Sequence, residues 1–129
     1  MRFMVMMKAD KDYEAGIPPP PELMAAVGKA SEEMARAGIL VGTGGLAPTS
    51  MGAKLRLSGG NVVVTDGPFA ETKEVIGGYA ILEAASKEEA IEMARRFLQL
   101  HADVLGPAYE TEAEVRRMFD ASDFASANR

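Results

Sequence analysis

The spacing of apolar residues in the first third of the chain predicts a strand, a loop and a helix. Arg2 to Lys8 is an apolar run without alternation, which is typical of a strand covered on both faces. Four consecutive prolines, Pro18 to Pro21, predict an extended loop after it. From Glu22 onward, apolar residues recur at offsets of three and four, which predicts an amphipathic helix closed by Gly38. The stripe consists of Leu23, Val27, Ala30, Met34 and Ala37.

The middle of the chain reads as strands separated by glycine-containing turns. Ile39 to Val41 opens a second strand that runs into a glycine-rich segment, residues 42–45. Ala53 to Leu57 and Asn61 to Thr65 flank Gly59-Gly60, so they predict a β-hairpin with a tight turn. After the turn-forming Asp66-Gly67-Pro68, a further strand is expected over residues 79–83, and the preceding pair Gly77-Gly78 is a candidate β-bulge.

The last third of the chain is expected to hold a helix, a strand and a tail. Ser86 with Glu89 three residues later forms a capping box, which marks the start of a second amphipathic helix. Glu112 to Phe119 is interpreted as a last strand, with a short helix as the alternative. Residues 120–129 are small and polar, and we expect a tail that is mobile or lies against a neighbour.

This order of elements predicts an α+β fold. Strand, helix, strand, inserted hairpin, strand, helix, strand matches the ferredoxin-like split β-α-β plan with an antiparallel sheet, formed by one domain over residues 1–119. Two helices can cover only one face of the sheet, yet the strands are apolar on both alternating sets. We therefore expect a homodimer in which two sheets face each other, with the hairpin at the edge of a cavity between them.

Composition narrows the functional classes. A chain of 129 residues without cysteine has no disulfide framework and no thiolate nucleophile, which fits a cytoplasmic protein. No apolar run approaches the length of a membrane span. The net charge is −5 and no basic patch is evident, so nucleic acid is not an expected partner.

His101 and Asp66 are the candidate catalytic residues. His101 is the only histidine, and its spacing from Phe97 puts it on the apolar face of the second helix. It could shuttle a proton, or it could be a histidine at the edge of the core satisfied by backbone. Asp66 could orient a histidine or act as a base, or it could simply cap its own turn.

Four further residues are candidates for substrate binding. Lys73 and Arg116 could hold an anionic group, and Phe69 offers an apolar wall. Tyr79 could place its hydroxyl in the same cleft, but a tyrosine packed in the core is the interpretation that its position favours. The fingerprints of nucleotide-binding loops and the ligand spacing of metal sites are absent from the sequence, so we expect neither cofactor nor structural metal.

One segment closely resembles a known family. Residues 65–74, Thr-Asp-Gly-Pro-Phe-Ala-Glu-Thr-Lys-Glu, followed by Gly77-Gly78-Tyr79, are similar to the YCII-related family, specifically to its branch with an Asp-Gly-Pro-Phe (DGPF) motif. Ala37-Gly38-Ile39-Leu40 and Glu114-Val115-Arg116 support the resemblance, which covers nearly the whole chain. It implies a dimeric α/β barrel and a cleft with a histidine and an aspartate proposed to act in proton transfer. It implies no single established reaction.

Two function classes follow as hypotheses. The first is a cofactor-independent lyase or isomerase that acts on a small anionic organic molecule at the dimer interface, with His101 and Asp66 moving the proton. The second is a non-catalytic module that binds a metabolite or a partner protein, with a link to transcriptional regulation as part of this hypothesis. A cleft filled by the protein's own side chains is the third, plainer possibility.

Overall fold

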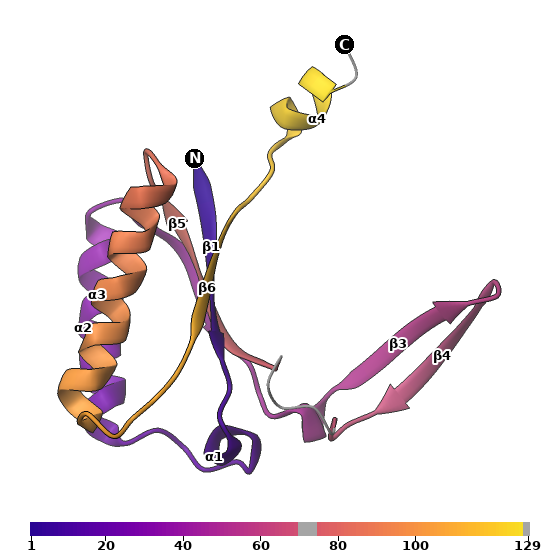
Figure 1. Ribbon diagram of the computed structural model, residues 1–129, viewed down its shortest axis with the longest axis horizontal. Helices are drawn as coiled ribbons and strands as arrows, with labels where there is room; N and C mark the ends of the chain where they lie inside the picture. The colour runs from indigo at the N-terminus through magenta and orange to yellow at the C-terminus, as the bar shows by residue number, and fades with distance from the viewer. Residues whose placement is uncertain (70–74, 128–129) are drawn as a thin grey trace.

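The computed structural model describes residues 1–69 and 75–127 and shows an α+β fold (Figure 1). In chain order the elements are β1 (Arg2–Lys8), α1 (Lys11–Glu14), α2 (Pro21–Arg36), β2 (Leu40–Gly45), the 3₁₀ turn η1 (Thr49–Met51), β3 (Ala53–Ser58), β4 (Asn61–Asp66), β5 (Ile76–Glu83), α3 (Lys87–Leu105), β6 (Ala113–Arg117) and α4 (Ala121–Ala127).

The main sheet has four antiparallel strands in the order β2-β5-β1-β6, which confirms the expected ferredoxin-like plan. Glu112 to Phe119 thus contributes a strand, not the alternative helix. The register of β1 and β5 shifts between Met7 and Lys8, where Gly77 is the extra residue, so the expected bulge is present.

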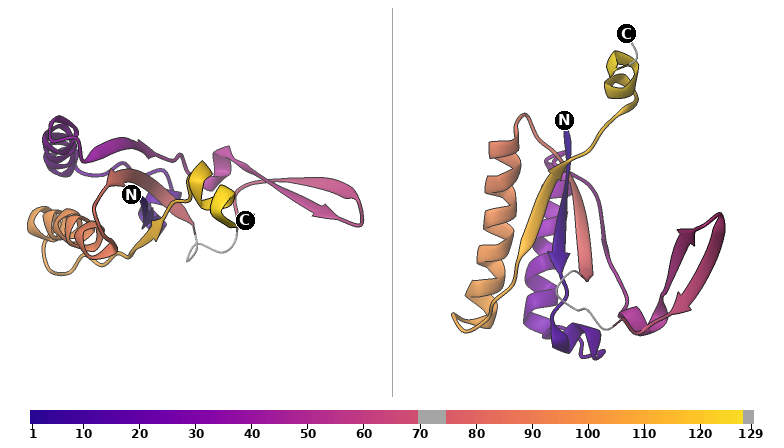
Figure 2. Two further views of the ribbon diagram at one scale, coloured as in Figure 1. Left: turned by 90° about the horizontal axis from the view of Figure 1, so that it is seen from above. Right: turned by 45° about the vertical axis from the view of Figure 1, so that its right-hand side comes forward.

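Helices α2 and α3 cover one face of the main sheet and leave the other without a helix (Figures 1 and 2). Phe3 and Val5 of β1 point toward the helices, where Val5 packs with Leu82 and Ala94. Because side chains alternate along a strand, Met4, Met6, Tyr79 and Ile81 belong to the opposite face, which we call the open face. The core is therefore one-sided within a single chain.

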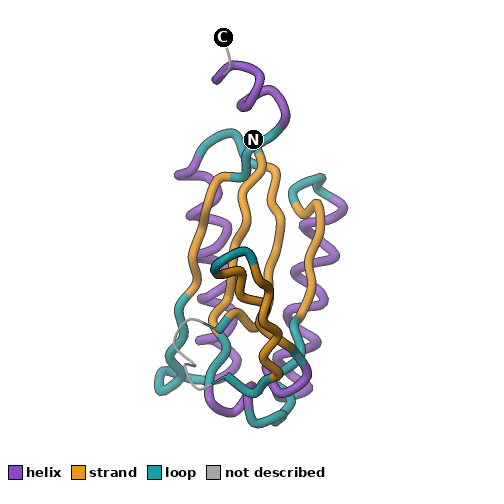
Figure 3. Tube along the Cα trace, turned by 90° about the vertical axis from the view of Figure 1, so that its right-hand side faces the viewer, coloured by secondary structure: helices purple, strands orange, loops and turns teal. Residues whose placement is uncertain are grey.

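The strands β3 and β4 form a separate two-stranded sheet, as the Gly59-Gly60 pair predicts. Both glycines have positive φ, 59° and 81°, which the tight hairpin turn requires. This hairpin projects away from the main sheet on the side opposite the helices (Figures 1 and 2). In Figure 3, where that side faces the viewer, the hairpin stands in front of the sheet.

Local sequence signals set the helix boundaries. Pro21 occupies the first turn of α2, where a missing N–H costs no hydrogen bond, and Gly38 follows the helix with a φ of +75°. Ser86 caps α3: its side chain accepts a hydrogen bond from the Glu89 amide at 3.2 Å. The Glu89 carboxylate in turn accepts from the Ala85 amide, so the expected capping box is present one residue wider than its usual form.

Two short helices lie where the sequence pattern predicts none. The helix α1 forms inside the expected loop because Asp10 caps it, with the Tyr13 amide donating to its carboxylate at 2.7 Å. The helix α4 forms inside the expected tail, where Asp120 accepts from the amides of Ser122 and Asp123. Hydrogen bonds from Ser122 and Asp123 lower the pKa of Asp120 below its ordinary value. Both caps lie in segments too short to show helical periodicity.

Within the described residues, none of the helices combines the length and the apolar character that crossing a membrane requires.

Candidate functional site

His101 lies on the buried face of α3, with 7% of its surface exposed. Its Nδ1 is 2.9 Å from the Phe97 carbonyl oxygen, one turn earlier in the helix. A carbonyl oxygen can only accept, so Nδ1 carries a hydrogen and donates it. In the neutral ring, Nε2 is then the nitrogen with the lone pair and can accept a hydrogen bond or a proton.

Aromatic rings hold the imidazole in place. The Phe97 ring meets it edge to face at 4.8 Å between centroids, and the Tyr109 ring is nearly parallel to it at 6.2 Å. Gly106 allows this second contact because its φ of +92° turns the chain after α3 and brings Tyr109 back toward the helix.

The Nε2 atom of His101 remains available to solvent. No side chain or backbone group in the described part of the chain forms a hydrogen bond with it, and its Nδ1 bond to Phe97 is the one polar contact of the ring. Yet among these residues there is no fully buried side-chain nitrogen or oxygen atom without a partner. Nε2 is therefore not fully buried, and His101 is among the residues that line a cavity.

His101 lines a cavity of about 450 Å³ near the start of α2 and the end of α3. Its lining includes residues of the N-terminal half of α2, of the C-terminal half of α3 and of the proline loop, residues 17–20. Its polar lining consists of Lys8, Asp10, Asp12, Tyr13 and Tyr109 besides His101. Asp10 is engaged with the Tyr13 amide, and the Tyr13 hydroxyl donates to the Leu46 carbonyl oxygen.

A second cavity of about 410 Å³ continues from the first between the sheet and the helices. The two cavities adjoin, because both are lined by Met7, Tyr13, Met24, Val27 and Phe97. The walls of the second cavity are almost entirely apolar; they include Val5, Leu82, Met34 and Ala94. The combined space fits the size of a small organic molecule, with His101 at its polar end.

The predicted site residues divide between this space and other parts of the fold. Tyr79 is among the residues that border the second cavity, although strand alternation puts its side chain on the open face, where the ring lies close over Gly44 and an added Cβ would be 3.0 Å from the hydroxyl. Asp66, Phe69 and Arg116 line neither cavity. Lys73 lies outside the described residues.

Arg116 belongs to β6 and pairs with Met4, which puts it on the open face of the sheet. Its side chain is 74% exposed, and its Nη1 lies 3.8 Å from a carboxylate oxygen of Glu114. Arg116 is therefore exposed on the face of the sheet that the helices do not cover, whereas His101 lies on the helix side.

The Asp-Gly-Pro-Phe segment forms a structural junction at the base of the hairpin. Asp66 is exposed and ends β4 opposite Ala53. The Gly67 amide donates to the Gly52 carbonyl oxygen at 2.9 Å, and the Phe69 amide donates to the Thr49 hydroxyl at 3.1 Å. These bonds fasten the hairpin to the turn η1.

Glu14 completes this junction from α1. Its carboxylate accepts the Thr49 amide at 2.9 Å and the Thr49 hydroxyl at 2.5 Å. The Phe69 ring also receives the Lys54 ammonium 4.6 Å from its centroid, in a cation–π contact. Phe69 thus packs against the hairpin in this chain, and Asp66 makes no contact with His101.

Tyr13, Tyr109 and the proline loop are site residues that the sequence pattern does not single out. They lie in irregular or very short segments, where no periodicity marks a buried side. The four prolines are a sequence signal for a rigid loop, but the helices that the loop meets follow only from the fold.

Within residues 1–69 and 75–127, no three histidine, aspartate or glutamate side chains lie close enough together to hold a metal ion.

Comparison with known proteins gives two matches. The family model for the YCII-related domain matches residues 1–105 of this chain. An uncharacterised protein of Rhizobium meliloti (strain 1021), R00369, is 50% identical over 50 residues. That alignment spans 39% of this chain and 40% of the length of the relative.

Proposed function

Because this chain belongs to the YCII-related family, we propose that it binds a small organic molecule in the cavity that His101 borders. The ligand has an apolar or aromatic body and one polar group that donates a hydrogen bond. The observation that carries this proposal is the unpartnered Nε2 of His101 at the end of an apolar space. The absence of cysteine favours the cytoplasm as its location.

The lining of the cavity selects this ligand class. Burial of an apolar body against Val5, Leu82 and Ala94 supplies affinity without a polar cost. Nε2 of the neutral imidazole accepts, so a hydroxyl or phenol matches it. Two carboxylates, Asp10 and Asp12, against one ammonium group, Lys8, leave the lining with a negative charge, which disfavours a molecule with several negative charges.

A phenol and its methyl ether test this proposal. We expect 4-ethylphenol to shift the imidazole NMR signals, which are free of overlap because His101 is the only histidine. The ether 4-ethylanisole has the same body without the donor, and it should bind roughly tenfold more weakly. His101→Phe keeps an aromatic ring beside Phe97 and Tyr109 but removes the acceptor, so it should erase this difference. Imidazole signals that respond to neither compound would refute the proposal.

Proton transfer is the second candidate function. The same Nε2 could take a proton from a bound ligand, as a cofactor-independent lyase or isomerase requires. In the described residues, however, His101 has a backbone carbonyl as its partner and no carboxylate. Asp66 could act with it only if a second copy of the chain brought it there. Turnover of a bound ligand that stops in both His101→Phe and Asp66→Asn would establish this function over simple binding.

We also propose that a second copy of the chain covers the open face of the main sheet. Met4, Met6, Tyr79 and Ile81 lie on this face, and no helix covers them. A two-fold dimer would bury the same apolar patch of both copies. Sedimentation equilibrium should give twice the mass of the chain, and a monomer at all concentrations would contradict this part of the proposal.

A further inference from the structure

The β3–β4 hairpin has one apolar face that nothing in the described chain covers. Residues directly opposite each other in the ladder share a face, so Leu55 lies with Val64 and Leu57 lies with Val62. These four side chains are 59–73% exposed. The other face holds Lys54, Arg56 and Val63 between polar neighbours. The hairpin is thus amphipathic, with its apolar side in water.

This exposure is not a feature of a loose loop. The base of the hairpin is held by the Gly67–Gly52 and Phe69–Thr49 hydrogen bonds. Glu14 adds to them because its carboxylate accepts hydrogen bonds from Thr49. A two-stranded ribbon alone is marginally stable in water, so a hairpin held outward by such a junction has its direction set by the rest of the fold. It leaves the fold on the side of the open sheet face (Figures 2 and 3).

We propose that the hairpin is an arm that reaches a second copy of this chain and packs its apolar face on the open sheet face of that copy. The inference rests on the proposed dimer and adds the element that holds it together. Each chain has two apolar surfaces without a partner, the arm and the open face. In a two-fold dimer the arm of each copy can meet the open face of the other copy, so both contacts form together. An exchange of arms therefore leaves neither surface in water.

Charge favours the same partner. Residues 53–66 carry Lys54 and Arg56 against Asp66, a net charge of +1, in a chain whose total is −5, so the remaining residues carry −6. On the open face, Glu83 and Glu114 are offset by their neighbours Arg2 and Arg116, so the attraction comes from the charge of the whole body and not from this face. A positive arm is attracted to such an acidic body, whereas two arms repel each other.

Two neighbouring valines provide a matched test. Val64 and Val63 are 61% and 57% exposed and lie on opposite faces of the hairpin. Val64→Lys should weaken dimerisation, measured by sedimentation, by roughly tenfold or more, whereas Val63→Lys should change it by less than about twofold. Circular dichroism verifies that both variants fold. Equal effects of the two substitutions would overturn the arm proposal. A wild-type chain that is monomeric would overturn the dimer and the arm together.

Disulfide trapping tests which surface the arm meets, because the chain has no cysteine of its own. Leu57→Cys chains are mixed with differently tagged chains that carry Met4→Cys, Met6→Cys or Ile81→Cys. We expect at least one mixture to form a disulfide between the two kinds of chain. Arg56→Cys, on the opposite face of the hairpin, should form none with the same chains. A dimer in which none of the Leu57→Cys mixtures is trapped would show that the sheets meet without the arms.

Discussion

Gly67 lies so close to Thr49 that a Cβ on Gly67 would stand 1.7 Å from the Thr49 carbonyl oxygen. No rotamer relieves this contact, because both atoms are fixed to the backbone. The second residue of the Asp-Gly-Pro-Phe segment is therefore glycine for a steric reason: a Cβ atom would clash with the Thr49 backbone. It lets the end of β4 run against the turn η1, to which Gly67 and Phe69 are hydrogen-bonded.

Gly67→Ala should lower the free energy of unfolding by about 2–3 kcal/mol, the cost of forcing apart a packed junction. Urea denaturation measures it. Gly28→Ala is the control: Gly28 lies within α2, and a Cβ added there would meet no atom within 4 Å. Alanine at this position should stabilise the helix by about 0.5–1 kcal/mol. A Gly67→Ala protein as stable as the wild type would contradict the close contact.

The cap of α3 should be measurable in the same way. Ser86→Ala removes the oxygen that accepts the Glu89 amide and should destabilise the protein by about 1 kcal/mol. Ser86→Asp restores an acceptor at the start of the helix and should recover that loss. If both substitutions destabilise equally, the role of Ser86 is not capping.

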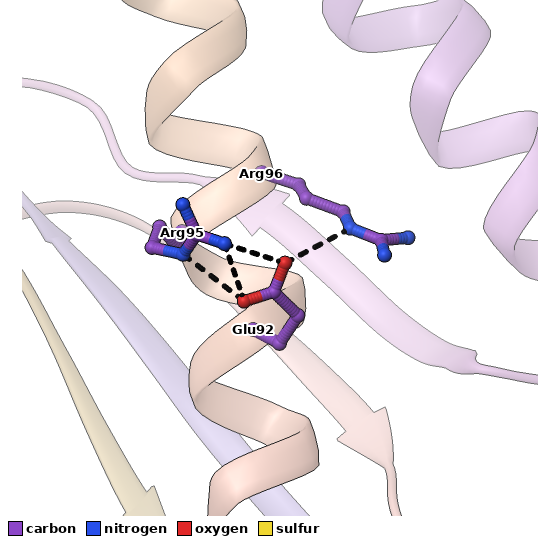
Figure 4. Close-up of polar contacts among 3 residues, drawn as sticks. All are labelled: Glu92, Arg95 and Arg96. Atoms are coloured by element: carbon purple, nitrogen blue, oxygen red, sulfur yellow. Dashed lines mark hydrogen bonds and ion pairs between the residues drawn. The ribbon is translucent and has the colours of Figure 1, made fainter.

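Glu92 should titrate below its ordinary pKa of 4.5 because Arg95 donates hydrogen bonds to both of its carboxylate oxygens, at 2.7–3.0 Å (Figure 4). Arg96 adds a longer contact of 3.3 Å from the next turn. A folded-state pKa below the unfolded one means that the interaction stabilises the protein above the unfolded pKa and is lost as the pH falls through the folded pKa. An NMR titration of the Glu92 carboxyl should show a larger rise in pKa for Arg95→Gln than for Arg96→Gln; the reverse order would disprove this assignment.

Asp66→Asn should leave binding of 4-ethylphenol within about twofold of the wild type, since Asp66 lines neither cavity and makes no contact with His101. His101→Phe should weaken it, as the lost acceptor requires. Calorimetric titration of both variants measures the two effects. A parallel loss in the two variants would mean that Asp66 reaches the cavity from another copy of the chain and would favour the proton-transfer function.

Much of the fold can be predicted from the sequence because the apolar residues that its long helices and strands bury recur at regular spacings. The stripe that starts at Leu23, the apolar run of β1 and the Ser86 cap each have one structural solution, and all three appear where they are expected. The helices α1 and α4 escape prediction because each depends on a single capping aspartate, Asp10 or Asp120, in a segment of a few residues.

Only part of the candidate site can be predicted from the sequence. Helical spacing from Phe97 correctly places His101 on the inner face of α3. Helical spacing cannot predict whether Asp66 contacts His101, because that depends on the direction in which the hairpin leaves the fold. The junction of Gly67 with Thr49 turns the hairpin outward, so within one chain Asp66 stays apart from the cavity. Tyr109 is the converse case: a turn at Gly106 brings it beside His101 without any periodic signal.

The position of β1 in the middle of the main sheet decides when the protein can finish folding. Although β1 comes before the other five strands of this sequence, its two neighbours are β5 and β6, and β6 ends at Arg117. A chain still being made on the ribosome can close the β3–β4 hairpin locally, since only two residues separate those strands. It cannot pair both sides of β1 until β6 has emerged, so the sheet is completed late and through contacts distant in sequence.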